Sequence, residues 1–213
     1  DTRISSDMLE NALAAGLCSV GADVVTLGVV PTPAVAYLTR YYKADAGVVI
    51  SASHNPCEYN GIKFFNSDGY KLSDGIENEI ESYILGEKAI EELPTHGKVG
   101  YVSANHNAVE DYVAFAVSTI DCRLDGMKIA VDCANGASYE TAFKALNKLG
   151  ANVEAIHNTP DGVNINHMCG STHMESLQAY VTSIGADIGI AFDGDADRML
   201  AVDENGKLID GDQ

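Results

Sequence analysis

Three aspartates stand at alternate positions, Asp193, Asp195 and Asp197, and Arg198 follows them. They come directly after the apolar run Ile188–Phe192, which has the pattern of a buried strand. Alternate residues of an extended loop point the same way, so the three carboxylates can converge on one hard cation such as Mg²⁺ or Ca²⁺. Without a cation, their mutual repulsion is costly in a partly dry site. The spacing predicts a divalent metal site, and a solvated acidic loop is the alternative.

A calcium-binding EF-hand loop also opens with acidic residues at its positions 1, 3 and 5, and here Glu204 falls at position 12. Position 6, where that loop needs glycine for a sharp turn, is Arg198. An EF-hand also places an amphipathic helix before the loop, where this chain has a strand pattern. A non-catalytic calcium-binding module is therefore the remote alternative.

A second polar stretch, residues 51–56, follows another short strand pattern at 46–50. It contains Ser53 and His54, and Lys63 lies ten residues beyond the serine. These residue types fit either a structural turn or a nucleophile. The Gly-x-Ser-x-Gly elbow of serine hydrolases is absent, which disfavours acyl transfer. A hydroxyl near His and Lys, with a separate oxygen-only metal loop, favours phosphoryl transfer, in which positioning and charge neutralisation supply most of the catalysis.

Both loops resemble those of the α-D-phosphohexomutases. The family pattern has a phosphoserine loop of Ser-His-Asn-Pro form and a metal loop of Asp-Gly-Asp-x-Asp-Arg form, and both stand here unaltered at 53–56 and 193–198. The resemblance extends over essentially all 213 residues. It implies an isomerase that acts as an intramolecular phosphotransferase on a sugar phosphate and requires Mg²⁺ and phosphorylation of Ser53.

The resemblance also implies a role for each site residue. Ser53 would carry the phosphoryl group, and Mg²⁺ would be held by an oxygen of the Ser53 phosphate with the carboxylates of the metal loop. His54, Lys63 and Arg198 would neighbour the phosphoryl group, with Lys63 either stabilising charge or transferring a proton. The metal ligands expected in this way are Ser53, Asp193, Asp195 and Asp197.

Within the family, the chain most resembles the branch that interconverts glucosamine 6-phosphate and glucosamine 1-phosphate through a 1,6-bisphosphate, for UDP-N-acetylglucosamine synthesis. The stretches 131–137, 164–166 and 169–173 favour this branch over phosphomannomutase and phosphoglucomutase. Family members have four domains. Residues 1–120 are expected to form most of domain I and residues 121–213 to form domain II, so the fragment alone is expected to be inactive and to lack the residues that select the sugar.

Composition fits a cytoplasmic enzyme. No apolar run approaches the ~20 residues of a membrane span, and the five cysteines form no Cys-x-x-Cys pair. A net charge of −18 with 13 Lys and Arg argues against nucleic acid as a partner. A sugar phosphate would then depend on the metal and on a local cluster of His54, Lys63, Lys71 and Arg198. A homodimer is a further expectation for the full-length protein.

Strand and helix patterns alternate along the chain, as in an α/β protein. We expect two consecutive three-layer α/β/α domains with mixed sheets, of the phosphohexomutase type. Asp7 and Glu10 have the spacing of a capping box that opens the first helix. The polar stretch 161–173 contains His167, Cys169 and His173, but their spacing matches no common zinc pattern, so we interpret it as a substrate-side or interdomain loop.

Overall fold

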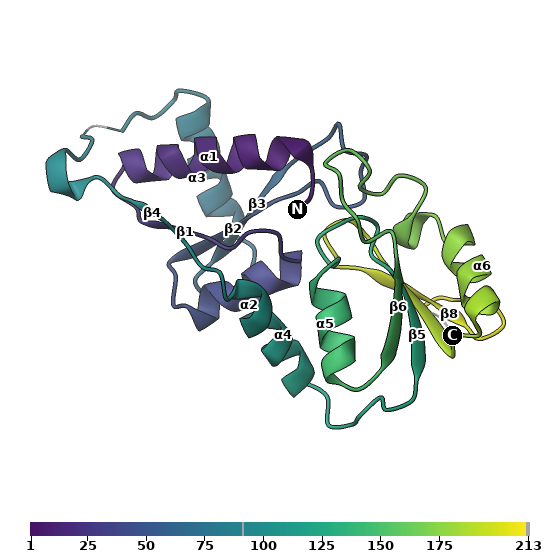
Figure 1. Ribbon diagram of the computed structural model, residues 1–213. Helices are drawn as coiled ribbons and strands as arrows, with labels where there is room; N and C mark the ends of the chain where they lie inside the picture. The colour runs from purple at the N-terminus through teal and green to yellow at the C-terminus, as the bar shows by residue number, and fades with distance from the viewer. Residues whose placement is uncertain (91, 212–213) are drawn as a thin grey trace.

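The computed structural model describes residues 1–90 and 92–211. Figure 1 shows two α/β halves side by side, the first in purple to teal and the second in green to yellow. The first half ends with helix α4 (Ala108–Ser118), and the second begins with strand β5 (Lys128–Asp132). Among the described residues, no helix is both long and apolar enough to cross a bilayer.

The first half contains two separate pairs of strands. Strand β1 (Val24–Thr26) pairs in parallel with β4 (Val102–Ala104), and β2 (Ala46–Ile50) pairs antiparallel with β3 (Ile62–Asn66). The second pairing sets Lys63 opposite Val49, so the chain returns this lysine to the strand end from which the serine loop emerges. This register explains how a residue ten positions beyond Ser53 comes back to it.

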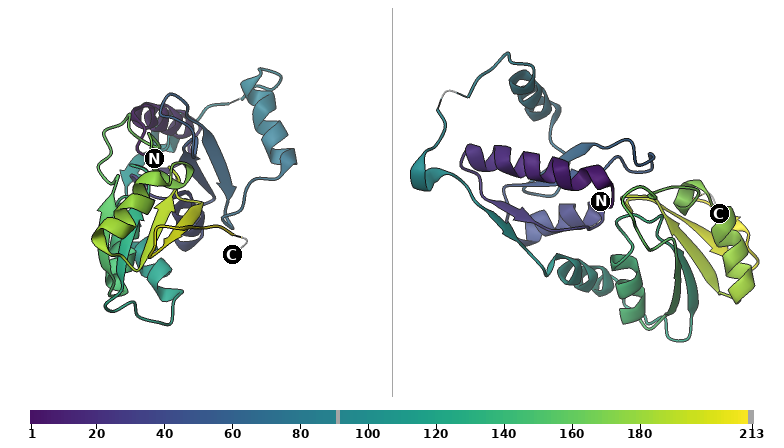
Figure 2. Two further views of the ribbon diagram at one scale, coloured as in Figure 1. Left: turned by 90° about the vertical axis from the view of Figure 1, so that its right-hand side faces the viewer. Right: turned by 45° about the horizontal axis from the view of Figure 1, so that its top comes forward.

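Three further helices belong to the first half: α1 (Ile4–Ser19), α2 (Thr32–Tyr41) and α3 (Asp74–Ile84). Helix α2 begins with Thr32-Pro33, where the fixed φ of proline suits a first turn. It packs closely on β2, since a Cβ at Gly47 would lie 2.1 Å from the Thr39 hydroxyl. Helix α3 buries no residue, and the right-hand view of Figure 2 shows it standing apart from the strands.

The second half is built on one five-stranded mixed sheet. Its order is β6-β5-β7-β8-β9, with β6, β5 and β7 parallel and with β8 and β9 antiparallel. The remaining strands are β6 (Asn152–Ile156), β7 (Ile188–Phe192), β8 (Met199–Asp203) and β9 (Leu208–Ile209). Because β5 and β7 are parallel neighbours, the loops that follow them meet at one edge of the sheet, where open α/β sheets place their sites.

Helices α5 (Thr141–Lys148) and α6 (Glu175–Ile184) cover opposite faces of this sheet. Ile129 and Val131 of β5 pack in a cluster with Ala142 of α5, whereas Ala130 packs in a cluster with Leu177 and Val181 of α6. Alternate residues of a strand face opposite sides, so these two clusters lie on the two faces. The prediction of an α/β fold with helices and mixed sheets is confirmed.

The first helix differs from the sequence-based prediction. Helix α1 begins at Ile4 with Arg3 as its N-cap, and no side chain caps it. Asp7 lies within the helix, so the predicted capping box at Asp7 and Glu10 is wrong. The start is set instead by the main chain, because the Ser6 amide donates to the Arg3 carbonyl at 2.9 Å while the Arg3 side chain is used elsewhere.

The two halves are joined along α4 and α5. Lys144 and Lys148 of α5 place their ammonium groups 2.7 and 2.9 Å from the carboxylate of Glu110 in α4. Hydrogen bonds from both lysines lower the pKa of Glu110 to about 2. At the other end of the junction, the Ile4 amide donates to the Gly162 carbonyl at 2.8 Å. Contacts at both ends fix the orientation of the halves at the site between them.

Candidate functional site

Ser53 lies in the loop after β2 and faces the second half of the molecule. Its Oγ donates a hydrogen bond of 2.7 Å to Asp193 Oδ2. The residue has φ of +54°, which is uncommon for a non-glycine residue and requires support from its surroundings. Part of that support comes from buried Ser51, whose Oγ accepts the Ser53 amide at 2.9 Å. The hydroxyl is therefore held against the metal loop.

Arg198 gathers the polar side chains around this hydroxyl. Its Nη2 donates to Ser53 Oγ at 2.7 Å and to Asp193 Oδ2 at 2.8 Å, and it lies 2.7 Å from Nδ1 of His54. The arginine side chain is about half exposed, whereas Asp193 is buried. An exposed guanidinium over a buried carboxylate leaves donors available to an anion at Ser53.

The three aspartates of the metal loop converge as their spacing predicted. Asp193, Asp195 and Asp197 each offer a carboxylate oxygen within 4.8 Å of the others. Asp193 and Asp195 are buried, and Asp197 is partly exposed. Burial, followed by repulsion from Asp195 and Asp193, raises the pKa of Asp197. This is the charge crowding that a divalent cation would relieve.

Lys63 and Thr32 bind Asp195 from the first half. Lys63 Nζ lies 2.6 Å from Asp195 Oδ2 and 3.7 Å from Asp197 Oδ2, and the Thr32 hydroxyl donates to Asp195 Oδ2 at 2.7 Å. Burial alone would raise the pKa of Asp195, but hydrogen bonds from Lys63 and Thr32 lower it. The other oxygen, Oδ1, is buried without a hydrogen-bond partner among the described residues. An ionised carboxylate with a free buried oxygen is a suitable donor set for Mg²⁺.

The surroundings of the metal loop do not match an EF-hand. The loop joins β7 to β8, which are antiparallel neighbours in the sheet, so strands and not helices flank it. Glu204, the residue at position 12, follows β8 and lies beyond the opposite end of that strand. It is therefore not placed as a ligand for this loop.

Two further expectations have different outcomes. Lys71 does not join the cationic cluster, since its Nζ lies 3.1 Å from Glu77 Oε2. The stretch 161–173 does lie between the halves, because the Asn166 side chain contacts the serine loop. That contact, together with those of Arg3 and Thr32, was missed by sequence reasoning. None of these three residues belongs to a recognisable chemical pattern in the sequence.

A second group of possible ligands, Asp132, His157 and Cys169, lies within 4.8 Å. Asp132 is already satisfied: Oδ2 lies 2.9 Å from His157 Nδ1 and accepts the Gly170 amide at 3.0 Å, and Oδ1 accepts the Ala134 amide at 2.9 Å. Burial, with a contribution from Asp132, raises the pKa of Cys169 to about 12, so its thiol is a poor metal ligand. We interpret this group as a structural anchor for three loops.

Comparison with known proteins agrees with this geometry. Residues 1–91 match the family model described as phosphoglucomutase/phosphomannomutase, alpha/beta/alpha domain I, and residues 108–206 match the model for alpha/beta/alpha domain II. The chain belongs to the phosphoglucomutase/phosphomannomutase family. The resemblance to phosphohexomutases drawn from the two loops is thereby confirmed.

Similar proteins of this family are found at high identity. Phosphoglucosamine mutase of Acetivibrio thermocellus is 64% identical over 213 residues, covering 100% of this chain and 47% of that protein. Phosphoglucosamine mutase of Clostridium acetobutylicum is 63% identical over 212 residues with the same coverage. The chain thus spans about half the length of these relatives. A crystal structure of a phosphoglucomutase/phosphomannomutase family protein from Burkholderia thailandensis matches with a TM-score of 0.81 at 30% identity, over 98% of this chain and 46% of that one.

Proposed function

We propose that this chain supplies the phosphoserine and metal-binding domains of a phosphoglucosamine mutase, which interconverts glucosamine 6-phosphate and glucosamine 1-phosphate. The observation that carries the proposal is the meeting of Ser53 Oγ, from the first half, with Asp193 and Arg198, from the second. The names of relatives that are 63–64% identical support the amino-sugar substrate. The product would serve UDP-N-acetylglucosamine synthesis.

In the proposed reaction, phosphorylated Ser53 donates its phosphoryl group to a sugar hydroxyl. The bond between Ser53 Oγ and phosphorus breaks, a bond between the sugar oxygen and phosphorus forms, and the proton of the sugar hydroxyl is transferred so that Ser53 Oγ ends as a hydroxyl. The resulting 1,6-bisphosphate reorients and returns its other phosphoryl group to Ser53. Each half-reaction therefore needs charge stabilisation at Ser53 and a path for one proton.

The residues around Ser53 are assigned these tasks. Arg198 and His54 bind the phosphoryl oxygens, since Arg198 already donates to Ser53 Oγ at 2.7 Å. Lys63 stabilises negative charge beside Asp195 and is the candidate for the proton transfer. Asp193, Asp195 and Asp197, with the Ser53 phosphate, would hold Mg²⁺, which neutralises the charge that accumulates during transfer. The unpartnered buried oxygen of Asp195 supports this assignment.

The remaining parts of the reaction are assigned to other domains of a longer protein. We propose that residues 1–120 and 121–213 are domains I and II, and that residues outside this chain select the sugar and anchor its distal phosphate. The 47% coverage of the relatives supports this division. On this basis we expect the chain alone to be inactive. We also propose, as separate expectations, that the full-length enzyme is cytoplasmic and forms a homodimer.

Phosphomannomutase or phosphoglucomutase activity is the second candidate. It is supported by the names of the two family models and by the 30% identical family protein from Burkholderia thailandensis. Both candidates use the same serine and metal loops, so they differ only in the sugar. The site between the halves does not distinguish them.

A coupled assay on the full-length protein separates the candidates. It compares glucosamine 6-phosphate, glucose 6-phosphate and mannose 6-phosphate, with Mg²⁺ and a trace of sugar bisphosphate. We expect a strong preference for the amino sugar. We also expect Ser53→Ala to lower the turnover by at least about 10³-fold, because Ser53 is the proposed carrier of the phosphoryl group. Preference for a neutral sugar would support the second candidate. Activity retained in Ser53→Ala would refute both.

A further inference from the structure

Two main-chain carbonyl groups of the serine loop each accept hydrogen bonds from two side chains. The Ser53 carbonyl oxygen accepts from Arg3 Nη2 at 3.0 Å and from Asn166 Nδ2 at 2.9 Å. The Asn55 carbonyl oxygen accepts from the same two atoms, at 2.6 and 3.0 Å. Arg3 belongs to the first half and Asn166 to the second, so the serine loop is held between them.

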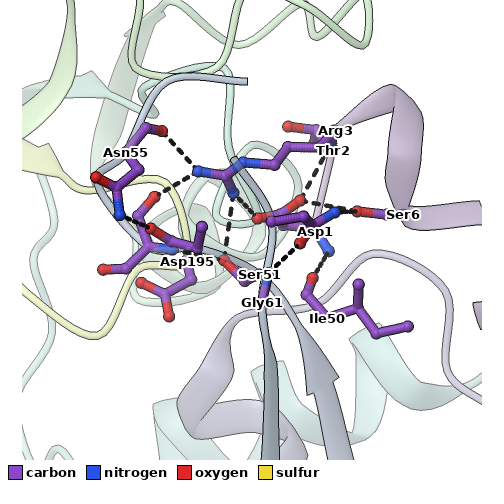
Figure 3. A network of polar contacts seen from close by, with 12 residues as sticks. Asp1, Thr2, Arg3, Ser6, Ile50, Ser51, Asn55, Gly61 and Asp195 are labelled. Atoms are coloured by element: carbon purple, nitrogen blue, oxygen red, sulfur yellow. Dashed lines mark hydrogen bonds and ion pairs between the residues drawn. The ribbon is translucent and has the colours of Figure 1, made fainter. Parts of the chain in front are cut away.

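Arg3 approaches the loop from the start of helix α1, and its side chain is fully buried. Its other terminal nitrogen, Nη1, contacts the Asp1 carboxylate and donates to Ser51 Oγ at 3.3 Å. Figure 3 shows the guanidinium reaching across the loop toward Ser51 and Asn55. A buried guanidinium is costly unless its donors are satisfied. Both terminal nitrogens of Arg3 have acceptors, whereas Nε is buried without a hydrogen-bond partner among the described residues, so the contacts of the terminal nitrogens hold the side chain against the loop.

Asn166 approaches from the loop between β6 and α6. Its φ is +57°, a left-handed conformation that asparagine tolerates better than most residues. The main-chain amide of Asn166 donates to the Ala134 carbonyl oxygen at 2.9 Å. The main-chain amide of Ala134 in turn donates to Asp132 Oδ1 at 2.9 Å. The side chain of Asn166 is therefore carried by a loop that is anchored in the second sheet.

We propose that Arg3 and Asn166 are positioning residues that clamp the serine loop and thereby set the direction of Ser53 Oγ during phosphoryl transfer. The inference rests on the proposed function. Ser53 has a left-handed backbone, which persists only where its surroundings hold it in place, and the clamp acts on its own carbonyl group. Carbonyl oxygens tied to Arg3 and Asn166 also cannot turn toward an anionic phosphoryl group. Because Asn166 comes from the second half, the reactive direction of Ser53 depends on docking of the two halves.

The test uses Asn166→Ala and Asn166→Asp in the full-length protein, with Asn147→Ala as the matched control. Asn147 is exposed, and its amide donates to the Phe143 carbonyl on α5, away from the serine loop. We expect kcat to fall by about 30-fold in Asn166→Ala with KM and Mg²⁺ affinity within about two-fold, since misplacing a reacting group by ~1 Å costs up to ~10². The kcat of Asn166→Asp should be lower still, because the substitution places a carboxylate next to two carbonyl oxygens.

Arg3→Lys tests the other side of the clamp, with Arg123→Lys as its control. Lysine keeps the charge but not the planar fork, so kcat should fall by about ten-fold or more. The exposed Arg123 side chain, which pairs with Asp125, should tolerate the change. A kcat of Asn166→Ala and Arg3→Lys within two-fold of their controls would overturn the proposal. The proposal would also be overturned if the whole decrease in kcat were explained by the fraction of each variant that is unfolded at the assay temperature.

Hydrogen exchange separates failure of the clamp from failure of the proposed function. If the wild-type protein transfers phosphoryl groups to none of the three sugars, the function is wrong, and the clamp is judged by exchange alone. Exchange of the main-chain amide hydrogens of residues 53–55 should then rise at least ten-fold in Asn166→Ala and stay unchanged in Asn147→Ala. Equal exchange in the two variants would refute the clamp.

Discussion

Thr32 holds Asp195 by both its main chain and its side chain. The Thr32 amide donates to the Asp195 carbonyl oxygen at 2.9 Å, and the Thr32 hydroxyl donates to Asp195 Oδ2 at 2.7 Å. Thr32 opens helix α2 in the first half, and Asp195 is the central residue of the metal loop in the second. The metal loop is therefore built partly by a residue 163 positions earlier in the chain.

Replacing Thr32 with valine keeps the shape of the side chain and removes its donor. We expect a loss of about 1.5–3 kcal/mol in the free energy of unfolding, because a buried hydrogen bond to a charged group is broken. Urea unfolding of the chain measures this loss. Thr39→Val is the control, since the Thr39 hydroxyl is also buried but donates to Val35 within its own helix. An equal effect in both variants would contradict a special role for Thr32.

Gly194 allows the serine and metal loops to approach each other. A Cβ at this position would lie 2.6 Å from both Asn166 Nδ2 and the Ser53 carbonyl oxygen. We expect Gly194→Ala to lower kcat of the full-length enzyme by about 10²-fold or more, because the loops must separate. Gly75→Ala is the control: Gly75 lies in α3 with open space around its Cβ position, so alanine there should leave kcat unchanged. Normal turnover in Gly194→Ala would show that the loops can separate without cost.

The two loops that form the candidate site were recognisable in the sequence because each is a short local pattern. Three aspartates at alternate positions after a strand, and a serine before histidine after another strand, keep their meaning without knowledge of the fold. Sheet geometry does not predict where the two loops meet, because the serine loop follows β2 of the first half and the metal loop follows β7 of a different sheet in the second half. Only the resemblance to the phosphohexomutases placed Ser53, Asp193 and Arg198 together, and in the structure they do lie together.

The clamp residues were not readable in the same way. Arg3 acts on carbonyl groups up to 52 positions away, and Asn166 on groups up to 113 positions away. Their partners are main-chain atoms, which every residue has, so no pairing of side-chain types reveals them. The start of α1 was misplaced for a related reason: Asp7 and Glu10 fit a capping rule, but main-chain contacts begin the helix at Ile4.

Lys63 Nζ lies 2.6 Å from Asp195 Oδ2 and 3.7 Å from Asp197 Oδ2, so its positive charge would compete with a cation for these carboxylates. We expect Lys63→Met to bind Mg²⁺ about three- to ten-fold more tightly, because a competing positive charge is removed. Turnover of the full-length enzyme should nevertheless fall by about 10²-fold or more, because charge stabilisation at the phosphoryl group is lost. Titration calorimetry gives the affinity and the coupled assay the turnover.

The matched control for this prediction is Lys71→Met. Lys71 is largely exposed and pairs with Glu77, so neither the affinity for Mg²⁺ nor the turnover should change. Weaker binding of Mg²⁺ by Lys63→Met would contradict competition and would indicate that the lysine organises the metal loop.

The pair of His157 and Asp132 should make the stability of the second half depend on pH. The hydrogen bond to Asp132 raises the pKa of His157 above its unfolded value of about 6.5. Since the folded protein holds the proton more tightly, this contribution is fully present below pH ~6.5 and is lost as the pH rises through the folded pKa. Between pH 6 and 8 the urea midpoint of the wild type should fall, and His157→Gln should remove most of that slope. His106→Gln, which alters an exposed histidine outside this pair, should keep the slope. If the urea midpoint of His157→Gln depended on pH as steeply as that of the wild type, the pH dependence would come from other groups.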